Sequence, residues 1–344
     1  MRDPLRVGVI GAGAMGAAHA RMLAAEVPGA VVAEVYDLDV GRAEAIASEV
    51  GARAASSAQA VVDSAEVDAV VIASPDDTHA PLALACLDAG KPTLCEKPLS
   101  PRAEEAHSVV DAEVALGRRL IQLGFMRRYD PGFVGLREAI GSGSLGAVRL
   151  IHAVHRNVSS STSTDSAGLI TGSMVHELDV VAWLLDDELT AIRVESPMAE
   201  GFLDPQLATL WTRGGVMATV EVFVNARYGY DVRCEAVGTH ASATLEPRAP
   251  IRLRTDGVDG VVIRDDFVAH FADAYRRELT AWVRAARDTG AAPTSSPSAW
   301  DGYVAAVAAR AGVDSLTSGT TCPITPGPRP AIYADPSAIA DGST

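Results

Sequence analysis

The glycine-rich stretch after the first apolar run constrains the fold of this chain more than any other feature. Residues 6–10 have the composition of a short strand buried in a parallel sheet, and a helical pattern covers residues 17–26. Between them lies the run Gly11-Ala12-Gly13-Ala14-Met15-Gly16. This order predicts a dinucleotide-binding turn, in which Gly11 permits the turn, Gly13 admits a pyrophosphate and Gly16 allows close helix packing. The phosphates would lie at the positive end of the helix dipole.

The next apolar run indicates which dinucleotide is bound. Residues 31–36 read as a second strand, which ends at Asp37, 21 positions after Gly16. A carboxylate at this spacing is expected to accept hydrogen bonds from both adenosine ribose hydroxyls and to repel a 2′-phosphate. The sequence therefore predicts NAD as the cofactor. Two alternatives stay open: Arg42 lies close enough to tolerate a phosphate, and Asp37 could simply cap the following helix.

Further short strands, at residues 68–73, 93–96 and 121–124, alternate with helical segments. Such alternation over about 120 residues predicts a doubly wound parallel sheet, which we assign to residues 1–124. Ser74 and Pro75 follow one strand and are expected to lie beside the nicotinamide ribose. His79 is expected either to contact the cofactor or to cap and pack.

The strand at residues 93–96 ends in Glu96, Lys97 and Pro98. Open α/β folds bind their ligands at the carboxyl ends of the strands, so Glu96 and Lys97 are expected to border the cofactor. Because the proline fixes its own φ and restricts the residue before it, the lysine amine is aimed in one direction. The alternative is an ordinary solvated lysine in a strand-to-helix turn.

The second half of the chain has a different pattern, with strand-like runs separated by short turns. They predict an α/β domain, residues 125–321, with a large, mostly antiparallel open sheet. The expected strands are residues 147–158, 207–212, 216–224, 232–237 and 242–245, and the expected helices are residues 175–185, 271–287 and 298–316. Residues 322–344 are rich in proline and glycine and read as a C-terminal tail.

Charge and cysteine content narrow the possible partners. The formal net charge of −15 argues against nucleic acid and anionic membranes. No uninterrupted apolar segment reaches the ~18 residues that a membrane span needs. The four cysteines show no metal-ligand spacing, so we expect no metal site and reduced thiols in a cytoplasmic protein.

Several blocks together resemble the Gfo/Idh/MocA family of oxidoreductases along nearly the whole chain, and within it the inositol 2-dehydrogenases. The blocks are Glu96-Lys97-Pro98, residues 124–131, His155-Arg156-Asn157, His176-Glu177-Leu178-Asp179, residues 228–235 and residues 297–303. The resemblance implies an N-terminal Rossmann domain that binds NAD, a C-terminal α/β domain and a homotetramer or dimer. It also implies that Lys97 and His176 are catalytic.

Oxidation of a secondary alcohol needs a base for the hydroxyl proton while hydride leaves the carbon. The imidazole of His176 suits this step because histidine titrates near neutrality, and Lys97 would stabilise the developing alkoxide. The expectation is that both groups converge on one alcohol oxygen beside the nicotinamide. The alternative for His176 is a packed helix histidine.

A polyol needs several directional polar partners, because unpaired buried groups penalise the wrong stereoisomer. The matching blocks imply Arg127, His155, Asn157 and Tyr230 for this role, although Arg127 could instead pair with Asp130 and Tyr230 could simply pack.

One position departs from the inositol enzymes, which usually carry Asp or Asn one helical turn before the catalytic histidine. Here that position is Gly172, so Ser173, Asp179 or a water is expected to take over. The predicted reaction is oxidation of myo-inositol to 2-keto-myo-inositol. The alternatives are another cyclitol such as scyllo-inositol or an aminocyclitol precursor, a pyranose sugar, and a non-catalytic NAD-binding sensor.

Overall fold

The computed structural model describes residues 3–160, 164–245 and 252–334. The chain divides into two compact units. Unit 1 comprises Met1–Met126, Tyr275–Ala306 and Pro326–Thr344, and unit 2 comprises Arg127–Ala274 and Val307–Thr325. The first division therefore lies two residues after the predicted boundary at residue 124. The sequence pattern did not indicate that later segments return to unit 1.

Unit 1 is built on a six-stranded sheet in which every pair is parallel, and the predicted doubly wound fold is confirmed. In the strand order β3-β2-β1-β4-β5-β6, the chain first adds β2 and β3 on one side of β1 and then adds β4, β5 and β6 on the other side. The central strands are continuous apolar runs because both faces of the sheet are buried. The strands are β1 (Leu5–Ile10), β2 (Ala30–Tyr36), β3 (Arg53–Ala54), β4 (Ala69–Ile72), β5 (Thr93–Glu96) and β6 (Ile121–Gly124).

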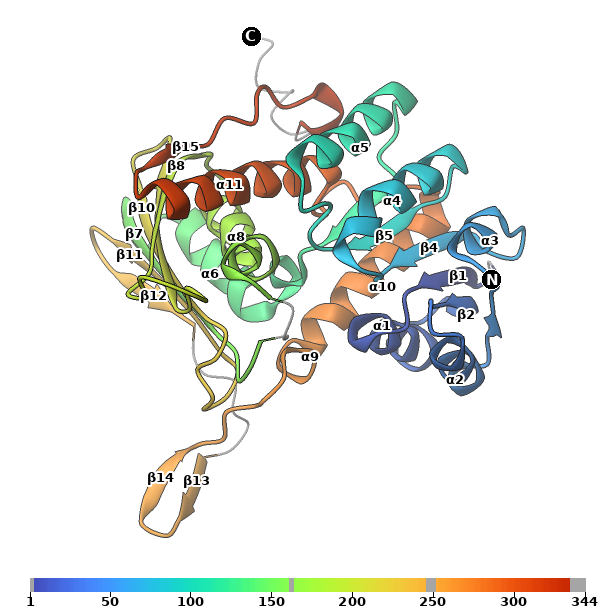
Figure 1. The fold of residues 1–344 in the computed structure, drawn as a ribbon, viewed down its shortest axis with the longest axis horizontal. Coiled ribbons are helices and arrows are strands. Elements are labelled where there is room, and N and C mark those ends of the chain that lie inside the picture. Colours follow the sequence, from blue (N-terminus) through green and yellow to red (C-terminus); the bar gives the residue numbers. More distant parts are fainter. Residues whose placement is uncertain (1–2, 161–163, 246–251, 335–344) are drawn as a thin grey trace. The chain divides into compact units, whose positions relative to one another are not determined.

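Helices connect these strands, as Figure 1 shows in blue to green. They are α1 (Ala14–Ala25), α2 (Val40–Val50), α3 (Ala58–Asp63), α4 (His79–Asp88) and α5 (Ala103–Leu116). Two long helices follow late in the chain, α10 (Ala272–Thr289) and α11 (Ala299–Ser318), close to their predicted bounds. Most of α10 belongs to unit 1, whereas α11 begins in unit 1 and ends in unit 2.

The predicted C-terminal tail is partly structured. Cys322–Pro323 forms β15, which pairs with β8 (Leu189–Glu195) in unit 2. The short helix Ala331–Tyr333 follows in unit 1, where the Tyr333 hydroxyl donates to Glu113 Oε2 at 2.7 Å. The other Glu113 oxygen accepts the backbone N–H groups of Leu120 and Ile121. Residues 335–344 lie outside the described part of the chain.

Unit 2 is built on a seven-stranded sheet of order β12-β11-β7-β10-β9-β8-β15. All its pairs are antiparallel except β7 with β10, so the predicted, mostly antiparallel sheet is confirmed. The predicted strands are β7 (Val148–Arg156), β9 (Gln206–Thr212), β10 (Met217–Phe223), β11 (Asp231–Gly238) and β12 (Ser242–Thr244). The sequence analysis missed β8 and the separate hairpin of β13 (Arg252–Thr255) and β14 (Val258–Val261).

Two helices of unit 2, α6 (Pro131–Gly141) and α8 (Val175–Leu185), lie on the same face of this sheet (Figure 1). Helix α6 begins sharply because Asp130 accepts the backbone N–H groups of Gly132 and Phe133, and Pro131 occupies the first helical position. Before α8 come one turn, α7 (Ser166–Gly168), and a π-helical segment, Leu169–Met174. The short helix α9 (Phe267–His270) precedes α10.

The continuous helical stretch Ser166–Leu185 is long and apolar enough to cross a membrane by length and composition alone. In the structure, however, 61% of its apolar window is buried inside the protein. Its carboxylates Glu177 and Asp179 are buried and form ion pairs with arginines. We therefore assign this stretch as the core helix of unit 2.

Candidate active site

The glycine loop of unit 1 has the backbone geometry that its sequence predicts. Gly11 has a φ of 94°, and a Cβ there would lie 2.4 Å from the Ala73 carbonyl oxygen. A Cβ on Gly16 would lie 1.8 Å from the Gly11 carbonyl oxygen. Gly13 is different, because a Cβ there meets nothing within 4 Å. Two of these glycines are thus required by the protein itself, whereas the third leaves space where a ligand can approach.

The first turn of α1 is suited to an anion. Its N-cap, Gly13, supplies no side-chain hydrogen bond, and the turn contains no acidic residue. Ala12 is buried, whereas Ala14 and Met15 at the tip of the loop are at least partly exposed. The N–H groups of the turn can therefore meet a pyrophosphate at the positive end of the helix dipole. The predicted cofactor loop, residues 11–16, fits NAD in this respect.

Asp37 lies at the end of β2, next to the loop. Its Oδ2 accepts the Ala12 N–H at 2.7 Å, and its Oδ1 accepts the Asp39 N–H at 2.9 Å. The N-cap of α2 is Asp39, which accepts the Arg42 N–H, so the capping alternative for Asp37 is wrong. The Arg42 guanidinium is half exposed and lies 3.5 Å from Asp37 Oδ1. The carboxylate is thus held firmly where a ribose is expected.

The turn after β4 contains Ser74, Pro75 and His79. The Ser74 hydroxyl bonds to that of Thr78 at 2.6 Å, and Pro75 caps the short helix Asp76–Thr78. His79 is 1% exposed, with Nδ1 2.7 Å from the Pro98 carbonyl oxygen and Nε2 2.8 Å from that of Ser74. The prediction that His79 contacts the cofactor is corrected, because both ring nitrogens link the Ser74 turn to the segment after Lys97.

Glu96 and Lys97 have different environments at the end of β5. The Glu96 side chain is buried, with Oε1 2.7 Å from His19 Nε2 and Oε2 accepting the Lys97 N–H at 3.2 Å. The prediction that Glu96 borders the cofactor is therefore corrected: its carboxylate faces the interior. Lys97 is half-buried, and its peptide bond to Pro98 is cis. Because β1, β4 and β5 are parallel neighbours, the glycine loop, Ser74 and Lys97 all follow the same edge of the sheet.

In unit 2, three of the predicted residues come together around α8. His176 lies in the first turn of this helix and is 8% exposed. Its ring centroid is 6.1 Å from that of His155, which is on β7. The His155 ring in turn lies edge-on to Tyr230, 5.8 Å away, just before β11. This arrangement follows from the register, since β7 pairs directly with β11.

A buried ion pair supports this group. Arg127 and Glu177 are 2% and 1% exposed, and their side chains bond to each other. Burial alone would lower the pKa of Arg127 and raise that of Glu177, but their mutual attraction reverses both shifts. His155 Nδ1 lies 3.3 Å from Glu177 Oε2 and 3.4 Å from Arg127 Nη2. The Asp130 side chain accepts the backbone N–H groups of Gly132 and Phe133 at the start of α6.

Arg127 thus supports His155 through its pair with Glu177, while its buried Nε has no hydrogen-bond partner among the described residues, so its contact with substrate stays a prediction. Glu177, which the sequence analysis quoted only as part of a motif, is the centre of the cluster. Burial raises the pKa of the nearby Tyr230 hydroxyl to about 12, so this group stays a neutral donor. A further aromatic neighbour, His270, lies 5.2 Å from the Tyr230 ring. No motif indicated His270, because its position depends on the fold of α9.

The remaining predicted residues are distributed around this cluster. Asp179, one of the groups expected to replace the missing partner of His176, is buried and ion-paired with Arg128. Asn157 follows β7, and its buried Oδ1 accepts no hydrogen bond from the described residues. Gly172 and Ser173 lie in the π-helical segment before α8, and a Cβ on Gly172 would meet nothing within 4 Å. The position one turn before His176 therefore has room for a side chain.

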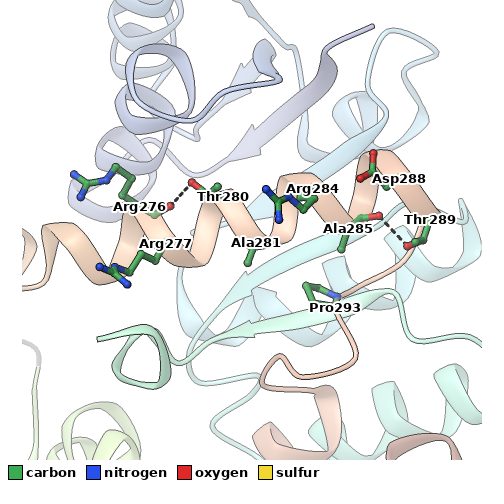
Figure 2. Close-up of a pocket in the computed structure, with 9 residues that line it drawn as sticks. All are labelled: Arg276, Arg277, Thr280, Ala281, Arg284, Ala285, Asp288, Thr289 and Pro293. Atoms are coloured by element: carbon green, nitrogen blue, oxygen red, sulfur yellow. Dashed lines mark hydrogen bonds between the residues drawn. The ribbon is translucent and has the colours of Figure 1, made fainter. Parts of the chain in front are cut away.

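A groove of about 540 Å³ lies elsewhere, along α10 of unit 1, as Figure 2 shows. It is lined by Arg276, Arg277, Thr280, Ala281, Arg284, Ala285, Asp288, Thr289 and Pro293. None of these belongs to the glycine loop or to the Lys97 segment, so the groove is not assigned to the cofactor. Within the described ranges, no group of three His, Cys, Asp or Glu side chains has the geometry of a metal site.

Comparison with known proteins adds to this geometry. Residues 5–125 match the oxidoreductase family with an NAD-binding Rossmann fold, and residues 133–244 match the GFO/IDH/MocA C-terminal domain. Inositol 2-dehydrogenase 2 of Saccharopolyspora erythraea is 45% identical over 336 residues, which cover 96% of this chain and 98% of that protein. Inositol 2-dehydrogenase of Streptomyces avermitilis is 43% identical over 339 residues, covering 97% and 98% respectively.

Solved structures show the same likeness. Myo-inositol dehydrogenase from Lactobacillus casei, in complex with NAD(H) and myo-inositol, is 35% identical to this chain, with a TM-score of 0.90. The match covers 96% of this chain and all of that structure's chain (100%).

Proposed function

Because the chain belongs to the GFO/IDH/MocA family of oxidoreductases, we propose that it is an NAD-dependent dehydrogenase of a cyclitol. The reaction that we infer is oxidation of myo-inositol to 2-keto-myo-inositol (scyllo-inosose). The observation that carries this proposal is the buried cluster of His155, His176 and Tyr230 in unit 2. Its polar groups suit a ligand rich in hydroxyls, and the relatives named above are inositol dehydrogenases.

The proposed chemistry assigns a proton step to unit 2. The glycine loop and Asp37 would hold NAD, which would supply the hydride acceptor for the alcohol carbon. His176 removes the hydroxyl proton, since a neutral imidazole is a base near neutral pH. Lys97, at the cofactor edge of unit 1, is the proposed hydrogen-bond donor that stabilises the alkoxide charge as the C–H bond breaks. The carbonyl product then leaves, and the proton removed from the hydroxyl group remains on His176.

Discrimination between polyols is proposed for the side chains around His176. His155, Asn157 and Tyr230 offer donors and acceptors from β7 and from the start of β11. Each would pair with one hydroxyl, and a stereoisomer that leaves such a buried group unpaired would be rejected. The Arg127–Glu177 ion pair contacts Nδ1 of His155 and so fixes the orientation of its imidazole.

Replacement of Lys97 tests the catalytic assignment. We expect Lys97→Ala to lower kcat with myo-inositol by at least about 100-fold while NAD still binds, because the lysine acts on the transition state. NADH formation would be followed by absorbance, and NAD binding by calorimetry. The matched control is Lys91→Ala, since the Lys91 amine donates to the Ser64 carbonyl oxygen instead. A Lys97→Ala enzyme with near-normal turnover would rule the assignment out.

A second candidate substrate is another cyclitol, an aminocyclitol precursor or a pyranose sugar. The observation that favours it is the space at Gly172, where a substrate substituent has room. A panel of myo-inositol, scyllo-inositol and hexoses in the same assay decides between these substrates. If no polyol reduces NAD at any pH tested, the protein is better described as a non-catalytic NAD-binding sensor.

The cellular context is part of the same proposal. All four cysteines are free thiols, three of them buried, which suits a cytoplasmic enzyme. We also infer a homotetramer or dimer, as the family resemblance implies. Light scattering on the purified protein would measure the subunit number directly.

A further inference from the structure

Glu278 is a buried carboxyl group that the proposed reaction does not use. It lies on α10 in unit 1 and is 0% exposed. Within the described ranges, neither of its oxygens has a hydrogen-bond partner. Buried polar groups in proteins are nearly always paired, and an unpaired ionised carboxylate is especially unfavourable. This group therefore needs a physical explanation.

The neighbours of Glu278 identify the region it belongs to. On the same face of α10, Tyr275 packs edge-on against the ring of His19, 5.7 Å away, and Trp282 is fully buried. His19, on α1, bonds to Glu96 Oε1 at 2.7 Å. Glu278 thus lies in the part of unit 1 that holds the end of β5 in place.

Glu96 is the charged group that acts on Glu278. Burial alone would raise the pKa of Glu96, but His19, Lys97 and His79 lower it, so Glu96 is ionised. Burial and the Glu96 charge both raise the pKa of Glu278 well above its ordinary value. Of two buried carboxyl groups in the same part of unit 1, the one without a hydrogen-bond partner keeps the proton.

We propose that Glu278 is held as a neutral carboxylic acid beside ionised Glu96, and that it is a positioning residue for Lys97. Glu96 Oε2 accepts the backbone N–H of Lys97, so the Glu96 carboxylate holds the main chain from which the amine extends. A neutral Glu278 keeps the field at Glu96 to one negative charge. An ionised Glu278 would add a second charge with no cation to meet it. The role in catalysis rests on the proposed function of Lys97.

The protonation state is tested by unfolding, which needs no substrate. In the unfolded chain Glu278 loses its proton near pH 4.5, whereas in the folded chain it keeps the proton to higher pH. The wild-type protein therefore loses stability from this group as pH rises above that value. Glu278→Gln has no proton to lose. Its unfolding midpoint, relative to wild type, should rise steadily between about pH 5 and about pH 8.

The matched control is Glu113→Gln, in the same unit. Glu113 is also fully buried, but it accepts bonds from two backbone N–H groups and from Tyr333. Its amide variant can keep the oxygen that accepts both backbone N–H groups but loses the one that accepts the Tyr333 hydroxyl, so it should unfold at a lower temperature than wild type. If Glu278→Gln also unfolds at a lower temperature, with a gap that does not widen with pH, then Glu278 is ionised and paired, and the proposal is wrong.

The positioning role is tested by Glu278→Leu, which has a similar size but no polar group. We expect kcat to fall about 10-fold while NAD affinity stays unchanged, and Glu278→Gln to restore kcat to within about two-fold of wild type. A second readout is independent of the substrate: acylation of Lys97, followed by mass spectrometry, should change in rate, with Lys91 as internal reference. Unaltered kcat and labelling in Glu278→Leu would overturn the positioning role. If Glu278→Leu does not fold, the pH dependence of Glu278→Gln still decides the protonation state.

Discussion

In unit 1 the cofactor loop is made of glycines and backbone groups, whereas in unit 2 the candidate substrate site is made of charged side chains buried against one another. At the loop, Gly11 and Gly16 are required because any side chain would strike a carbonyl oxygen. Around His155, the structure depends instead on the Arg127–Glu177 ion pair. The first site is specified by sterics and the second by electrostatics, so they should fail in different ways.

The largest effect is expected from breaking the ion pair of unit 2. Glu177→Ala leaves the Arg127 charge buried without its partner, and such losses typically cost about 3–5 kcal/mol of unfolding free energy. Urea denaturation would measure it. The matched control, Glu188→Ala, breaks the exposed Arg213–Glu188 pair of the same unit and should change stability little. Equal effects in the two variants would contradict the electrostatic description of this site.

The next largest effect is expected at the glycine loop. In Gly16→Ala the new Cβ lies 1.8 Å from the Gly11 carbonyl oxygen, so the loop must shift. We expect the free energy of unfolding to fall by about 1–3 kcal/mol and NAD binding to weaken. Gly13→Ala meets nothing within 4 Å, at a φ of −67°. We expect it to fold normally but to bind NAD more weakly, because the methyl group lies where the pyrophosphate approaches.

Calorimetric titration with NAD and thermal unfolding of both variants test this pair. The two measurements separate a glycine needed by the fold from one needed by the ligand. If Gly13→Ala bound NAD as tightly as wild type, the pyrophosphate could not lie over this part of the loop.

The same contrast explains how far the sequence alone predicts the site. The loop, Asp37 and Lys97 are predictable because each follows directly from a strand end, and parallel strands bring their carboxyl ends to one edge. The sheet of unit 2 is predictable because apolar and polar residues alternate along its strands. Short or exposed strands such as β13 and β14 are the exceptions.

The pairing of buried charges is not predictable in this way. Arg127 and Glu177 are 50 positions apart, and Arg128 and Asp179 are 51 apart. Adjacent arginines and nearby carboxylates offer several pairings, and only the packing of α8 decides between them. For the same reason the sequence does not show that Arg127 pairs with Glu177 or that Asp179 pairs with Arg128. Glu96 was misplaced, and the role of His79 was left open, because a motif does not show which way a side chain turns.

A smaller effect is expected from a buried side-chain hydrogen bond in unit 1. It tests whether the difference between sterics and electrostatics holds only for the two sites or for the whole units. Unit 1 also contains a buried carboxyl, Glu113, which accepts the Tyr333 hydroxyl. Tyr333→Phe removes that donor and should lower the unfolding free energy by about 1 kcal/mol, the typical net value of one buried hydrogen bond. Urea denaturation would measure it. A loss as large as that of Glu177→Ala would mean that buried side-chain pairs stabilise both units alike.

The smallest effect concerns the charge that this chain lacks one helical turn before His176. The space at Gly172 can hold an aspartate side chain, and a carboxylate there would favour the protonated imidazole. Since the base must be neutral, the acid limb of the kcat/KM pH profile should move to higher pH in Gly172→Asp. A helical pair of this spacing contributes about 0.4 kcal/mol, which corresponds to a shift of about 0.3 pH unit. Gly172→Asn, which adds no charge, is the control.

A shift in the aspartate variant alone would show that a single carboxylate added in the π-helical segment before α8 tunes the base. A shift of equal size in both variants would instead point to a change of shape. If the acid limb moved in neither variant, His176 would not be the group whose titration sets that limb. Another histidine of the cluster, such as His155, would then be the better candidate for the base.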